Sequence, residues 1–173
     1  ETQRISFSKE LIKNTNIDTR MIRQFESFPA AAHPMSILTS MMGSLSSYYP
    51  ELSTNDRVLD LENFDRSAAS AISKVMTVAA LSHRISNGLP VNYPKKDFGF
   101  AENFLHLMFS NPHDEYRAPK EVAEALDLIL LLHADHEQNC STSTVRMVAS
   151  SGANLFASIT AGICALWGPL HGG

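Results

Sequence analysis

The feature that most constrains the fold is an apolar run, ALDLILLLHADH, which begins shortly after Pro119. Its leucine and isoleucine side chains would fall on every side of a helix rather than along one stripe. Such a helix, expected from Lys120 to His136, has no face suited to water, so it belongs in the middle of a large helical protein. No segment shows sustained period-two alternation, and the sequence therefore predicts an all-α fold.

Other segments carry apolar residues at helical spacing, with asparagine, glycine or proline at their ends. They are HPMSILTSMMGSLSSYYP, DRSAASAISKVMTVAALSHRISNGLP, residues 101–110, TSTVRMVAS, and LFASITAGICALW with Asn154 as its expected cap. STND at 53–56 is expected to be a turn. The helices account for most of the chain after residue 30.

The 173 residues, 44% of them hydrophobic, are enough for one domain with a sizeable core. Residues 1–30 are polar with weak periodicity, so we expect an N-terminal arm there, or a remnant of a missing N-terminal region. Residues 31–173 are expected to form part of a large helical domain. The chain lacks an initiating Met and stops on the glycine-rich GPLHGG, which indicates a fragment.

Charge and cysteine content exclude several classes of protein. The formal charge is -4, from 14 Lys+Arg against 18 Asp+Glu, and no basic run is suited to phosphates, so no nucleic-acid partner is expected. Cys140 and Cys164 are far apart, which argues against a disulfide framework and favours a reducing, cytoplasmic location. The apolar runs are shorter than the roughly 18 residues of a membrane span, so no membrane partner is expected.

The stretch HADHEQN, residues 133–139, has three interpretations. On the expected helix, His133 and His136 would continue an apolar face, near a helix end whose partial negative charge favours an imidazolium. That arrangement suits binding of an anionic substrate. A metal site is less favoured, because the pattern is not a zinc peptidase motif and lacks an obvious third ligand. Two hydrogen-bonded core histidines are the third interpretation.

The final segment, GPLHGG, places His171 in a loop whose glycines allow close approach of a ligand. A lone loop histidine is weak evidence for catalysis. The hydroxyl-rich segment CSTSTVR lacks a G-x-S-x-G motif, so a serine hydrolase is not expected, and one or two of its hydroxyls are expected to cap a helix.

Four segments together resemble citrate synthase, in its bacterial hexamer-forming branch. They are HPMSIL, NYPKKDFGFAENFLHLMFS, LLLHADHEQNCSTSTVR and SSGANLFASITAGICALWGPLHGG, and the resemblance runs from about Phe28 to Gly173. It implies an enzyme that condenses acetyl-CoA with oxaloacetate and water to give citrate and CoA. The resemblance implies no metal and no cofactor, since acetyl-CoA is a substrate.

The resemblance also implies roles for particular residues. His171 would be catalytic, donating a hydrogen bond to the thioester carbonyl and stabilising the enolate. His136 and Asn139 would lie at the oxaloacetate site. Ser141 would accept a hydrogen bond from His171 and hold its ring, while His133 and Asp135 would shape the helix end.

Regulation and assembly are implied by the same resemblance. His33, Tyr49 and Lys74 resemble part of the allosteric site through which NADH inhibits the hexameric branch. Ser70 stands where that branch would have an arginine, and His113 where some members have a reactive cysteine, so the NADH site departs from the pattern. A homo-oligomer, either a dimer or a hexamer, is expected.

The family's second catalytic histidine, its proton-abstracting aspartate and its carboxylate-binding arginines all lie beyond GPLHGG. This chain alone is therefore expected to be inactive, because base and electrophile must act on one bound geometry. Three alternatives remain: 2-methylcitrate synthase with propionyl-CoA, a non-catalytic helical assembly module, and a zinc-binding protein.

Overall fold

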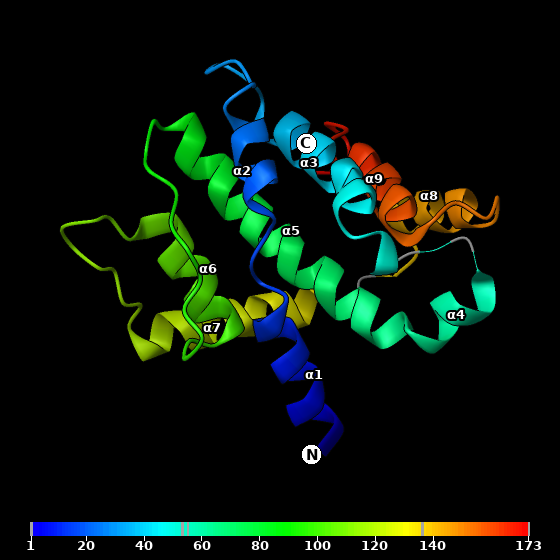
Figure 1. Ribbon diagram of the computed structural model, residues 1–173, viewed down its shortest axis with the longest axis horizontal. Helices are drawn as coiled ribbons and strands as arrows, with labels where there is room; N and C mark the ends of the chain where they lie inside the picture. Colours follow the sequence, from blue (N-terminus) through cyan, green and yellow to red (C-terminus); the bar gives the residue numbers. More distant parts are fainter. Residues whose placement is uncertain (1, 53, 55, 136, 173) are drawn as a thin grey trace.

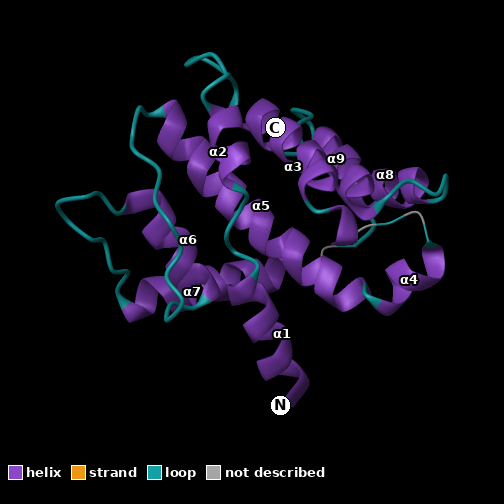
Figure 2. Ribbon diagram, viewed as in Figure 1, coloured by secondary structure: helices purple, strands orange, loops and turns teal. Residues whose placement is uncertain are grey.

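A computed structural model describes residues 2–52, 54, 56–135 and 137–172. Within those residues every regular element is helical, so the predicted all-α class is confirmed (Figure 1, Figure 2). In chain order the elements are α1 (Thr2–Lys13), α2 (Thr19–Phe25), α3 (Pro34–Tyr48), the short 3-10 helix η1 (Pro50–Leu52), α4 (Arg57–Glu62), α5 (Phe64–Ser86), α6 (Phe100–Phe109), α7 (Lys120–His133), α8 (Cys140–Ala149) and α9 (Leu155–Leu166).

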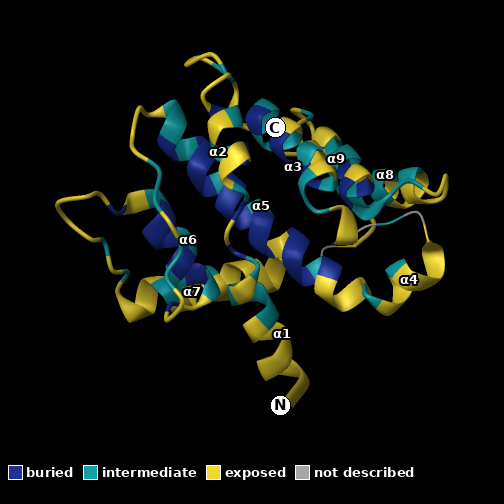
Figure 3. Ribbon diagram, viewed as in Figure 1, coloured by how far each residue is buried: buried dark blue, intermediate teal, exposed yellow. Residues whose placement is uncertain are grey.

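The 23-residue helix α5 is the centre of the fold. It packs against α3 on one side and α6 on the other, while α9 lies on α3 and α8 lies on α9 (Figure 1). Small buried side chains such as Ala69 and Ala80 allow the neighbouring helices to approach α5 closely. The main core lies between α2, α3, α5 and α9 (Figure 3). Its fully buried side chains include Met21, Phe25, Met41, Met42, Leu45, Val78 and Phe156.

Some of the first thirty residues belong to the hydrophobic core. α1 projects from the body of the molecule and has no buried residue, whereas α2 packs Met21 and Phe25 into the main core (Figure 3). Asp18 starts α2 by accepting a hydrogen bond from the Arg20 N–H at 2.8 Å. The domain boundary expected at residue 30 stays a prediction, although α2 shares its core with the helices that follow it.

Three predicted helix ends are confirmed. α3 ends at Tyr48, shortly before Pro50, the proline at the end of its predicted segment. α5 ends before Asn87, and Gly88 then adopts a φ of +67°, which favours glycine. The Asn154 side chain accepts a hydrogen bond from the Ala157 N–H at 2.9 Å and so caps α9.

One expectation about helix position was wrong, and one helix was missed. The helix predicted for 120–136 ends at His133, with Ala134 as its C-cap, and no glycine or proline in residues 134–139 marks that end in the sequence. Residues 57–62 form α4, which the sequence analysis missed because six residues are too few to show helical periodicity. Of the turn expected at 53–56, residues 53 and 55 lie outside the described residues.

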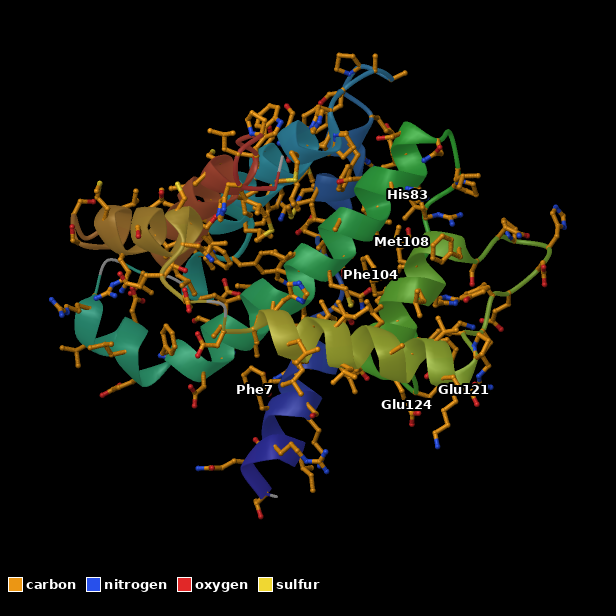
Figure 4. All side chains as sticks on the ribbon, turned by 180° about the vertical axis from the view of Figure 1, so that it is seen from behind. Phe7, His83, Phe104, Met108, Glu121 and Glu124 are labelled. Carbon is orange, nitrogen blue, oxygen red and sulfur yellow. The ribbon has the colours of Figure 1, made fainter. Side chains whose placement is uncertain are left out.

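The helix α7, which the sequence places in the interior, lies on the surface of this chain. No residue of α7 is buried, and the Leu131 and Leu132 side chains are 71% and 65% exposed. Seen from behind, α7 crosses the face of the molecule, with Glu121 and Glu124 near its N-terminal end (Figure 4). Its inner side borders an apolar cavity of about 730 Å³ shared with α5, α6 and α9. Across the described residues, none of the helices is long and apolar enough to cross a bilayer.

Candidate functional site

His171 lies in a tight turn that begins at the end of α9. Trp167 is the C-cap of this helix, and its N–H donates to the Ile163 carbonyl at 3.0 Å. The His171 N–H then donates to the Gly168 carbonyl at 2.9 Å, which closes the turn. The half-buried imidazole is thus carried by backbone that is hydrogen-bonded to itself and continuous with a helix.

Ser141 lies against His171, as the resemblance implies. The Ser141 Oγ is 2.9 Å from the Nε2 of His171, and the Ser141 N–H donates to the same nitrogen at 3.3 Å. The Oγ is also 2.9 Å from the carbonyl oxygen of Gly162. Ser141 is the second residue of α8, so α8 and α9 together bring these groups to one point.

The two contacts at Nε2 determine where the imidazole carries its proton. A backbone N–H only donates, so Nε2 accepts from Ser141 and the neutral ring carries its proton on Nδ1. The Ser141 hydroxyl has a single proton, and it donates this proton to the Gly162 carbonyl at 2.9 Å. The donor to Nε2 in this geometry is the backbone N–H of Ser141, and the expectation that its hydroxyl accepts from His171 stays a prediction. This geometry leaves Nδ1–H available to a ligand carbonyl.

Gly162 is what allows α8 and α9 to approach closely enough for this contact. A Cβ placed on Gly162 would lie 2.6 Å from the Val145 Cγ2 and 3.5 Å from the Ser141 carbonyl oxygen. The first distance is too short for two carbon atoms that are not bonded to each other. Any residue other than glycine would therefore require Val145 or one of the two helices to move. The sequence analysis missed this role; the signal was a glycine in the interior of a helix, where glycine is unfavourable.

Asn139 is the N-cap of α8. Its Oδ1 accepts a hydrogen bond from the Thr142 N–H at 2.9 Å, which satisfies one of the free donors of the first turn. The residue is half-buried and lies two positions before Ser141. Asn139 therefore fixes the helix end that carries Ser141, and its proposed contact with oxaloacetate remains a prediction.

The stretch HADHEQN forms the connection between α7 and α8. His133 is the last residue of α7 and is exposed; its Nδ1 is 2.7 Å from the Ile129 carbonyl oxygen, so that nitrogen carries a proton. Glu137 has a φ of +61°, in the left-handed region that few residues other than glycine adopt. His136, the predicted oxaloacetate ligand, lies outside the described residues. The expectation that both histidines continue one helix face therefore cannot be followed past His133, where α7 ends.

A metal site at this stretch has no support from the geometry. Among the residues that the structure describes, no group of three or more His, Cys, Asp or Glu side chains is placed to hold a metal ion.

The three residues implied in NADH binding do not form one cluster. Lys74 and Tyr49 lie together, with the Lys74 Nζ 3.9 Å from the centre of the Tyr49 ring. His33 and Tyr49 flank opposite ends of the 15-residue helix α3, which separates them by roughly 24 Å. Lys74 is buried, and its Nζ donates to the carbonyl oxygens of Asn14 and Asn16 at 3.2 and 3.1 Å.

The environment of Lys74 changes its titration. Burial lowers the pKa of Lys74 to about 8, while the nearby Glu51 acts in the opposite direction. Burial also raises the pKa of the Tyr49 hydroxyl. The Lys74 ammonium already has protein partners, so in this structure it is not directed at an external ligand.

The whole chain, residues 1–173, matches the family model described as "Citrate synthase, C-terminal domain". Among solved structures, citrate synthase from Pyrobaculum aerophilum is 30% identical with a TM-score of 0.84, and the match covers 97% of this chain and 42% of that one.

Two other solved structures show the same fold at lower identity. The Thermoplasma acidophilum citrate synthase, in a ternary complex with carboxymethyl coenzyme A and oxaloacetate, is 23% identical with a TM-score of 0.86, over 99% of this chain and 42% of that one. The Thermotoga maritima enzyme is 22% identical with a TM-score of 0.79, over 100% of this chain and 42% of that one. The chain thus spans 42% of the length of each of these three structures.

Proposed function

Because the chain belongs to the citrate synthase family, we propose that the protein condenses acetyl-CoA with oxaloacetate and water to give citrate and free CoA. The observation that carries the proposal is the contact between Ser141 and His171, which leaves Nδ1–H of His171 free to donate to a substrate carbonyl. The chain spans less than half of its solved relatives, so the activity is proposed for the whole protein.

The proposed reaction begins with removal of a proton from the methyl carbon of acetyl-CoA by a carboxylate. His171 donates from Nδ1 to the thioester carbonyl oxygen and stabilises the negative charge that develops there. The enolate carbon then attacks the ketone carbon of oxaloacetate, forming the new C–C bond. Water cleaves the resulting thioester, the C–S bond breaks, and CoA leaves as the thiol. We assign no described residue of this chain to the carboxylate.

We assign oxaloacetate binding to the connection between α7 and α8, through His136 and Asn139. The support for His136 is the HADHEQN motif, and the support for Asn139 is its position two residues before Ser141. In the Thermoplasma acidophilum relative, oxaloacetate and a coenzyme A analogue are bound together. The same pair of ligands on this protein would bring the methyl carbon and the ketone together beside His171.

Several finer assignments accompany this function. We propose a cytoplasmic homo-oligomer of the bacterial hexamer-forming type, with NADH as an inhibitor, and a preference for acetyl-CoA over propionyl-CoA. One methylene in a pocket is worth only about 1 to 3 kcal/mol, so some turnover of propionyl-CoA is expected. The separation of His33 from Tyr49 and Lys74 gives no support to a single NADH site, and an NADH titration of turnover tests that assignment directly.

The test is release of the CoA thiol by the intact gene product, with oxaloacetate and either acetyl-CoA or propionyl-CoA. We expect release that depends on oxaloacetate, is faster with acetyl-CoA, and falls about 10²- to 10³-fold in His171→Ala. Faster release with propionyl-CoA would make the protein a 2-methylcitrate synthase. Absence of release with both substrates, from folded protein, would favour a non-catalytic helical module.

A further inference from the structure

The ring of His33 stacks on the only tryptophan of the chain. The imidazole of His33 and the indole of Trp167 have centroids 5.4 Å apart and planes inclined by 24°. This contact joins the start of α3 to the end of α9, where the C-terminal turn of the chain also lies (Figure 1). It is far from the Lys74 and Tyr49 pair at the other end of α3.

The His33 ring is held in one orientation by the helix that it caps. Its Nδ1 accepts a hydrogen bond from the Met35 N–H at 3.2 Å. Since the backbone N–H only donates, Nδ1 carries no proton in this arrangement. Pro34 fixes the backbone at the first position of α3, which further restricts the residue before it. The imidazole is therefore a fixed surface on which the indole rests.

Trp167 is connected rigidly to His171. Its N–H donates to the Ile163 carbonyl, the Gly168 N–H donates to Ala165, and the His171 N–H donates to Gly168, at 3.0, 3.1 and 2.9 Å. Each of these bonds joins backbone positions three or four residues apart, so the segment from α9 to His171 moves as one unit. A shift of the Trp167 backbone would displace the imidazole of His171 relative to Ser141.

We infer that His33 is a positioning residue for His171. It fixes the indole of Trp167 and thereby the turn that carries the catalytic imidazole, while Ser141 holds the imidazole itself at Nε2. The catalytic consequence rests on the proposed function, whereas the structural coupling does not. A displacement of about 1 Å at a reacting group costs up to about 100-fold in rate, so a modest loosening of the turn is measurable.

The test variant is His33→Asn in the intact protein, because asparagine keeps an N-cap acceptor but has no ring to stack. Trp167→Phe keeps a ring at the other position. The matched control is His83→Asn, which removes an imidazole on α5 that lies away from the turn. The centre of this ring is 6.2 Å from the centre of the Phe109 ring on α6. Thermal unfolding of each variant verifies that it is folded.

The readouts separate positioning from simple stability. We expect His33→Asn to lower kcat about tenfold with KM for oxaloacetate unchanged, and to weaken the near-ultraviolet circular dichroism of the Trp167 indole, isolated by subtracting the Trp167→Phe spectrum. His83→Asn should change neither quantity. Unchanged kcat and unchanged dichroism in His33→Asn would overturn the inference, and so would an equal loss of kcat in His83→Asn.

A second measurement keeps the inference testable if the wild type releases no CoA. The ring-proton NMR signals of His171 report its surroundings without turnover. They should shift in His33→Asn and stay in place in His83→Asn. Signals of His171 that do not move in His33→Asn would overturn the coupling. If the signals move in His33→Asn but the wild type releases no CoA, only the proposed reaction is overturned.

Discussion

Gly162 and Val145 face each other so closely that a methyl group on Gly162 would lie 2.6 Å from the Val145 Cγ2. We expect Gly162→Ala to destabilise the protein by about 1 to 3 kcal/mol, because Val145 is β-branched and has little rotamer freedom in a helix. The double variant Gly162→Ala/Val145→Ala should recover most of this loss. Denaturant unfolding of the wild type, the single variant and the double variant measures both the loss of stability and its recovery.

Gly43 provides the matched control for this prediction. A Cβ on Gly43 would lie 3.6 Å from the Thr160 Cγ2, an ordinary contact distance. Gly43→Ala should therefore stabilise α3 by roughly 0.5 to 1 kcal/mol through helix propensity. If Gly162→Ala also stabilised the protein, the close approach of α8 and α9 would not depend on glycine.

Ser141→Ala should lower turnover by about 10- to 100-fold, because the imidazole of His171 would lose one of the two groups that contact Nε2. The backbone N–H of residue 141 remains in the variant, so the loss should be smaller than in His171→Ala. The pH dependence of kcat is measured together with turnover. Turnover and pH profile both equal to the wild type would contradict a role for Ser141.

Asn139→Ala should destabilise the protein by about 1 kcal/mol through loss of the α8 cap. Asn139→Ser should restore that stability, because serine is an equally good N-cap. If the amide also contacts oxaloacetate, KM for oxaloacetate should rise in both variants. A normal KM in Asn139→Ser would limit this residue to the cap.

Lys74 makes stability depend on pH in the alkaline range. Burial lowers its folded pKa to about 8, from 10.5 for an ordinary lysine, so between these values the unfolded chain binds more protons than the folded chain. The free energy of unfolding should therefore rise with pH, by about 1.5 kcal/mol between about pH 8 and about pH 9.5.

The control for Lys74 is Lys74→Met, which cannot titrate and should lack this rise. Its stability at any one pH is not the test, since methionine leaves the Asn14 and Asn16 carbonyls without their donor. At higher pH the raised pKa of Tyr49 acts in the opposite direction, because the unfolded tyrosine then loses its proton first. Equal slopes for wild type and Lys74→Met below about pH 9.5 would contradict the prediction.

Most of the helices could be predicted from the sequence because periodicity and end signals agree. Pro50, Asn154 and the Asn87-Gly88 pair lie where the structure ends or starts a helix. The end of α7 could not be predicted in this way, because no glycine or proline follows the last helical residue, His133, in residues 134–139. An apolar pattern reports what a helix would bury, and it does not report where the backbone leaves the helix.

The candidate site was predictable only in part. The pairing of Ser141 with His171 came from resemblance to a family, since no spacing rule joins residues 30 positions apart. The donation of the Ser141 backbone N–H to Nε2 required coordinates. The stack of His33 on Trp167 left no sequence signal, because it depends on how two helices lie against each other.

The separation of Ser141 from His171 along the chain also bears on how the protein folds. Ser141 lies in α8 and His171 follows α9, so the packing of these two adjacent helices brings the pair together. Their contact spans far less of the chain than the contact between His33 and Trp167, so it is expected to form earlier. The contact between His33 and Trp167 must wait until distant parts of the chain have met, so the turn that carries His171 acquires this contact late in folding.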